Sequence, residues 1–107
     1  MENKILDTIK YIRHRPKMFF WNDDTFNSYI IYFQGFFYSF NCSTNIDLER
    51  EISVWYQKRV KFKAPNMSWF SQFDHINKDL TEIEKIEKLL DTLEFFFKEY
   101  FSNKSYP

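Results

Sequence analysis

The chain has 107 residues, of which 44% are hydrophobic and 22% aromatic, and its formal net charge is +0. This length suits one domain, and the aromatic content supplies ample material for a core. A balanced charge excludes a global electrostatic attraction to nucleic acid or anionic membranes, so any such attraction must come from local patches. We therefore expect one domain over residues 1–107, soluble and cytoplasmic, without a membrane-spanning run.

Residue usage favours helices over sheets. The single glycine leaves few of the positive-φ turns that hairpins need. Cys42 is the only cysteine, so no internal disulfide can form, which suits a reducing compartment. Apolar residues repeat with a helical period along most of the chain. The predicted fold class is all-α, a single compact domain of about five helices.

The first two predicted helices flank an Arg-Pro turn. One covers residues 4–13 and is stopped by Pro16, after which Met18 and Phe19 pack on the core. In this turn we expect Arg15 to pair with one of the two aspartates at positions 23 and 24.

The second predicted helix covers residues 25–40, with the cluster at residues 22–24 as its N-cap. It is apolar on nearly every side and is expected to be the central, most buried helix. Its length favours helix over strand. Gly35 lies inside it, and close approach of another helix is the favoured explanation, with a hinge or a ligand contact as the alternatives.

Capping residues mark three further helices. Asp47 precedes a helix over residues 48–59, and Ser68 precedes one over residues 69–76. A capping box of Thr81 and Glu84 begins the last helix, which extends to about Tyr100. Between the helices predicted over residues 48–59 and 69–76, residues 60–63 alternate apolar and basic side chains, which allows a short strand or an extended edge there.

The last helix is predicted to have two distinct faces. Its core stripe contains the following apolar residues: Ile83, Ile86, Leu90, Leu93, Phe97 and Phe101. A neighbouring arc carries four carboxylates, at Glu84, Glu87, Asp91 and Glu94. One interpretation is an ordinary solvated helix face with favourable pairs to lysines one turn away. The other is a binding surface for a basic partner, and we take these four residues as the candidate partner-binding site.

Catalytic, metal and cofactor sites are not expected. A Cys–His nucleophile pair would need Cys42 beside His14 or His75, and the residues around Cys42 match no known nucleophile motif. Two histidines and one cysteine are too few for a typical metal site. One glycine cannot build a phosphate-binding loop.

Two basic clusters offer an alternative function. One surrounds Pro16 and the other covers residues 58–63, where Lys58, Arg59, Lys61 and Lys63 alternate with Val60 and Phe62. Basic and aromatic residues interleaved in this way can bind single-stranded nucleic acid through phosphate contacts and stacking. The structural explanation is that these residues cap helix ends and solvate the surface.

The segment Ile12-Arg13-His14-Arg15-Pro16-Lys17-Met18-Phe19-Phe20 resembles a known pattern, I-R-x-R-P-x-M-[YF]. This pattern opens small helical bacterial proteins found among the immunity proteins of polymorphic-toxin and contact-dependent growth inhibition systems. The resemblance continues at Phe33-Gln34-Gly35-Phe36, at Trp55-Tyr56-Gln57-Lys58-Arg59, at Ser68-Trp69-Phe70 and in the acidic final helix. The chain departs from the pattern at Lys17 and at Trp21-Asn22, where the family usually has glycine.

The resemblance implies a non-enzymatic immunity protein that binds the C-terminal domain of a cognate toxin. Many such toxins are nucleases with basic clefts, which the acidic face would complement. A small nucleic-acid-binding module using residues 58–63 is the alternative. A homo-oligomer held through exposed aromatic residues such as Trp21, Trp69 and Phe70 is a further option.

Overall fold

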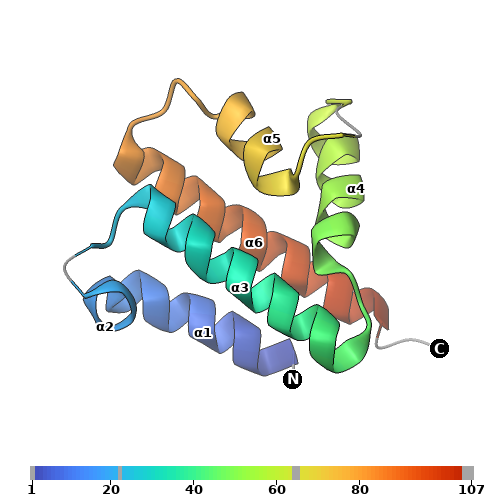
Figure 1. The fold of residues 1–107 in the computed structure, drawn as a ribbon, viewed down its shortest axis with the longest axis horizontal. Helices are drawn as coiled ribbons and strands as arrows, with labels where there is room; N and C mark the ends of the chain where they lie inside the picture. Colours follow the sequence, from blue (N-terminus) through green and yellow to red (C-terminus); the bar gives the residue numbers. More distant parts are fainter. Residues whose placement is uncertain (1, 22, 64–65, 105–107) are drawn as a thin grey trace. The chain divides into compact units, whose positions relative to one another are not determined.

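Apolar side chains at helical spacing build an all-α fold. The computed structural model describes residues 2–21, 23–63 and 66–104. This part of the chain forms six helices and no strand: α1 (Glu2–His14), α2 (Pro16–Phe20), α3 (Phe26–Thr44), α4 (Leu48–Val60), α5 (Trp69–Ile76) and α6 (Glu82–Lys104) (Figure 1). The prediction of an all-α single domain is confirmed, with one more short helix than expected.

Within the domain, the helices group into two compact units. The first contains Met1–Ser28 and Thr81–Pro107, and so includes α1, α2, the first turn of α3, and α6. The second contains Tyr29–Leu80, and so includes the rest of α3 with α4 and α5. Each unit has buried apolar residues of its own.

The first unit is built on contact between α1 and α6. On α1, Ile5, Ile9 and Ile12 are buried at the expected i, i+4, i+7 spacing. On α6, the buried residues are Leu89, Leu90, Leu93, Phe96 and Phe97.

The core face of α6 is therefore shifted from the predicted stripe. Leu89 and Phe96 belong to it, while Ile86 and Phe101 are only half-buried. Ile83 is 71% exposed, so its placement in the core was wrong. It lies in the first turn of α6, and the fully buried residues begin more than a turn later.

The Arg-Pro turn differs from the prediction in its detail. Arg15 does interrupt the helix, but Pro16 then begins α2 at its first position, where the missing N–H of proline costs nothing. This extra turn directs Phe20 into the core and leaves Met18 72% exposed, so the expectation for Met18 was wrong. Phe19 is half-buried.

The predicted ion pair of Arg15 is also not formed. Its guanidinium Nη1 lies 3.9 Å from Met18 Sδ, while Asp24 is 3.9 Å from the Lys17 ammonium. The structure thus pairs Asp24 with the lysine that lies inside α2, and Arg15 stays outside any helix.

The helix α3 begins at Phe26 with Thr25 as its cap. The Ser28 N–H donates to Thr25 Oγ1 at 3.3 Å, so Thr25 takes the role predicted for the preceding Asn-Asp-Asp cluster, whose Asn22 lies outside the described residues. This first turn is tied to α6, because the Phe26 N–H donates to Glu82 Oε1 at 3.3 Å and the Lys85 ammonium lies 5.3 Å from the Phe26 ring centre.

Only one stripe of α3 is fully buried. Tyr29, Phe33, Phe37 and Phe40 form it. Ile31 is 60% and Tyr38 73% exposed, so this helix, although apolar on nearly every side, is fully buried on only one of its faces. The helix α3 has more aromatic side chains than one face of a helix can bury.

An aromatic cluster fills the second unit. The Trp69 ring lies 6.5 Å from that of Phe37 and 5.7 Å from that of Tyr56, and Tyr56 in turn lies 6.2 Å from Phe73. The cluster joins α3, α4 and α5. Trp69 and Phe70 are both buried, which removes them from the exposed aromatics proposed for oligomer contacts.

Two predicted caps begin the helices of this unit. Asp47 accepts a hydrogen bond from the Arg50 N–H at 3.2 Å, and Ser68 accepts one from the Ser71 N–H at 3.2 Å. The caps fix where α4 and α5 start, and hence the direction in which Tyr56 and Trp69 enter the cluster.

Replacement of Phe33 by Ala should destabilise the protein by about 3–5 kcal/mol, because it removes a fully buried ring and leaves a cavity. Urea unfolding measures this change. Ile31→Ala on the same helix is the control and should change stability by no more than about 0.5 kcal/mol, since that side chain is exposed. Equal losses in the two variants would contradict the assigned burial.

Gly35→Ala should stabilise the protein by about 0.5–1 kcal/mol, because alanine is the better helix former. The predicted close approach at Gly35 is wrong, since a methyl group there would meet no atom within 4 Å apart from its chain neighbours and the backbone of its own helix. Thermal unfolding measures the gain, and Ser39→Ala, at another exposed position of α3, should give a smaller one. A loss of stability in Gly35→Ala would show that another group packs on this glycine.

Candidate functional site

The helix α6 places the four predicted site carboxylates on one face. Glu84, Glu87, Asp91 and Glu94 follow one another at intervals of three and four residues within Glu82–Lys104. The first three are exposed, while the Glu94 side chain is 35% exposed. Their shared face is thus as predicted, but each carboxylate has different surroundings.

Glu84 contributes to the start of α6. The Thr81 N–H donates to Glu84 Oε1 at 2.9 Å, and the Glu84 N–H donates to Thr81 Oγ1 at 3.2 Å. This reciprocal pair is the predicted capping box. The Glu84 carboxylate therefore has a structural role whether or not it also contacts a partner.

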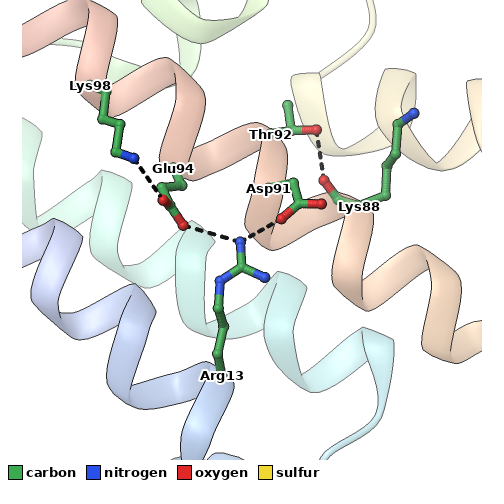
Figure 2. A network of polar contacts seen from close by, with 6 residues as sticks. All are labelled: Arg13, Lys88, Asp91, Thr92, Glu94 and Lys98. Carbon is green, nitrogen blue, oxygen red and sulfur yellow. Dashed lines mark hydrogen bonds and ion pairs between the residues drawn. The ribbon is translucent and has the colours of Figure 1, made fainter.

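Arg13 joins α1 to the acidic face (Figure 2). Its Nη2 lies 2.7 Å from Asp91 Oδ1 and 3.2 Å from Glu94 Oε1. The second oxygen of Glu94 is 2.9 Å from the Lys98 ammonium, the predicted i, i+4 pair. Asp91 and Glu94 are consequently held in place by charges of the protein itself.

The Glu94 carboxyl has a lowered pKa. The hydrogen bond from Lys98 is the largest cause, and the positive charges of Lys98 and Arg13 add to it, whereas partial burial opposes it. The charged form of Glu94 is therefore favoured in the folded protein.

Glu87 and Asp91 present the accessible negative charge of this face. The Asp91 side chain is 70% exposed although it pairs with Arg13. Glu87 is exposed and makes no ion pair with a described residue. A positively charged group could approach both without first breaking the contacts that hold α1 to α6.

The basic segment at the end of α4 forms a second candidate site. Lys61 ends the helix in the left-handed conformation, at φ 56° and ψ 45°, and of the two options considered for residues 60–63 the short strand does not form. A pocket of about 470 Å³ lies here, lined by Val54, Gln57, Lys58, Lys61, Phe62 and Lys63. Arg59 is not among these residues, and its guanidinium lies 5.3 Å from the Trp55 ring centre.

A third concave region carries Glu49, which the sequence analysis did not single out, beside the capping residue Asp47. A pocket of about 340 Å³ is lined by residues of α3 and of the starts of α4 and α5, among them Tyr38, Asp47 and Glu49. Glu49 accepts a hydrogen bond from the Trp69 N–H. Burial and the charge of Asp47 raise the Glu49 pKa, while the Trp69 hydrogen bond opposes the shift.

The residues considered for catalysis lie on three different helices. Cys42 is exposed and lies within α3, not in a turn. His75 stacks its ring 5.7 Å from Phe62, and His14 is exposed at the end of α1. Within the described ranges, no group of three or more His, Cys, Asp or Glu is placed to hold a metal ion.

Comparisons with known proteins identify no relative. No family model matches the sequence, and neither curated proteins nor solved structures yield a match. As far as the structure describes the chain, no helix is both long enough and apolar enough to cross a membrane.

Glu94→Gln should make the unfolding free energy less dependent on pH in the acidic range. Because the Glu94 pKa is lowered below 4.5 on folding, its charge stabilises the native state above that pH, and this contribution is lost as the pH falls through the lowered value. The difference in unfolding free energy between wild type and variant should therefore shrink on acidification.

Urea unfolding over a pH series measures this difference. Glu87→Gln is the matched control, since Glu87 has no ion pair with a described residue, and its profile should follow the wild type. A constant gap between wild type and Glu94→Gln at every pH would contradict the assigned ion pairs.

Proposed function

We propose that this chain is a non-enzymatic immunity protein that binds and neutralises a cognate bacterial toxin. The observation that carries the proposal is the exposed acidic face of α6, where Glu87 and Asp91 are accessible while Arg13 holds α6 to α1. The resemblance of residues 12–20 to the opening of such immunity proteins supplies the biological context.

The proposed mechanism is occlusion. A toxin that acts on nucleic acid needs a positively charged cleft to bind phosphates. An acidic helix face placed over such a cleft would block its active or docking surface. Complementary charges also steer the encounter, so the acidic face should raise the association rate more than it adds to affinity.

Glu87 is the residue that best isolates this role. Asp91 and Glu94 pair with Arg13, and Glu84 caps α6, so changing any of these three also disturbs the protein itself. Glu87 has no such contact with a described residue. A change at Glu87 therefore alters the charge of the face without removing an internal contact.

The alternative functions use other surfaces. Nucleic-acid binding would use residues 58–63 in the second unit, and its affinity should fall steeply with salt. A homo-oligomer would now depend on residues such as Trp21, which is 84% exposed, because Trp69 and Phe70 are buried. Sedimentation at several concentrations separates this option from the other two.

Glu87→Lys should slow association with the toxin by about tenfold at low salt, with a much smaller effect at high salt. The toxin tested is the C-terminal domain encoded beside this chain, and stopped-flow fluorescence measures the rates. Asp7→Lys, a reversal at an exposed position of α1, is the matched control and should leave the rate within about twofold.

Protection of cells provides the second readout. Cells that express the toxin domain should survive only when this chain is present. If Glu87→Lys and Asp7→Lys bind at the wild-type rate, the interface lies elsewhere on the chain. If the wild-type chain does not bind the neighbouring product, the immunity proposal fails.

A further inference from the structure

The pocket at the end of α4 gathers three lysines around an apolar wall. Lys58 lies in the last turn of α4, and Lys61 and Lys63 follow the helix. Val54 and Phe62 supply the apolar part of the lining. The volume of about 470 Å³ falls in the range of small-ligand sites.

The backbone at Lys61 creates this arrangement. Its N–H donates to the Gln57 carbonyl oxygen, and the Phe62 N–H donates to the same oxygen at 3.1 Å. These bonds form a left-handed helix end, which turns the chain so that Phe62 and Lys63 line the same pocket as Lys58. Glycine is the usual residue at such a position, since a Cβ atom there crowds the backbone. Lys61 is one of three non-glycine residues with a positive φ in the part of the chain that the structure describes.

Three positive charges line the pocket without a carboxylate partner among the described residues. Lys58, Lys61 and Lys63 make no ion pair with a described residue. The C-terminus of a helix carries only about half a negative charge, which cannot balance three ammonium groups. An anionic ligand would supply the missing charge.

The Phe62 ring in the pocket lining indicates which class of anion would bind best. Phe62 is half-buried, and its ring lies 5.7 Å from that of His75 at an angle of 35°. His75 thus supports the Phe62 ring at the pocket wall. An aromatic base could stack on this ring and gain affinity from the contact, which a bare phosphate could not.

We infer that this pocket binds a nucleoside phosphate, with its phosphate on Lys58, Lys61 and Lys63 and its base against Phe62. The ligand is a free nucleotide or one residue of a single strand, since both present the same chemistry. The pocket does not include the acidic face of α6, and nucleotide binding does not depend on toxin binding. The two proposals can therefore be tested separately.

Lys61→Gly is the decisive variant, because it removes a phosphate contact while improving the backbone fit. It should leave the melting temperature unchanged or higher and weaken binding of adenosine monophosphate about tenfold. For a single-stranded oligonucleotide, it should also lower the salt slope of the affinity by about 0.7. Lys78→Ala removes an exposed lysine of the same unit outside the pocket and should bind as wild type does.

Calorimetric titration with adenosine monophosphate, inorganic phosphate and an oligothymidylate separates the possible sources. Tighter binding of the mononucleotide or the oligonucleotide than of inorganic phosphate supports the site and tells which of the two it prefers. Phe62→Leu should abolish that preference while keeping the wall apolar. Equal binding of all three probes, no binding of any, or equal losses in Lys61→Gly and Lys78→Ala would overturn the inference.

Discussion

The Arg13 guanidinium ties α1 to the acidic face of α6 through two carboxylates, and this contact decides how much of that face remains available. The isoleucines of α1 and the leucines and phenylalanines of α6 bury the apolar faces of the two helices. Apolar burial alone does not specify direction, whereas Arg13 fixes α1 against Asp91 and Glu94. Partly exposed ion pairs contribute little stability individually. Their importance here is that they engage Asp91 and Glu94, whereas Glu87 on the same face is exposed and makes no ion pair with a described residue.

The neutral total charge conceals two local surfaces of opposite sign. The carboxylates of α6 lie in the first unit, and the lysines around Phe62 lie in the second. A balanced composition therefore does not exclude electrostatic recognition, since attraction acts over about 8–10 Å at physiological ionic strength. A basic protein and an organic phosphate could each find a complementary surface on this chain.

Local features were predictable from the sequence, whereas long-range ones were not. The caps at Asp47, Ser68 and Thr81 depend on residues within one turn, and all three form as expected. The common face of the four carboxylates follows from helical period alone. By contrast, Arg13 and Asp91 are 78 residues apart, and no pattern in the sequence connects them. The prediction that Ile83 and Met18 are buried was wrong for a similar reason. Neighbouring elements decide how far along a helix the side chains are covered, and the local sequence does not show this.

Chemical-shift mapping on the folded chain tests the account most directly. The isotope-labelled chain would be titrated with the toxin domain encoded beside it. The account predicts that the largest changes follow Glu84, Glu87 and Asp91 along the exposed face of α6, while the pocket around Phe62 stays unperturbed. Changes confined to other surfaces, or no change at saturating toxin, would contradict an acidic interface on α6.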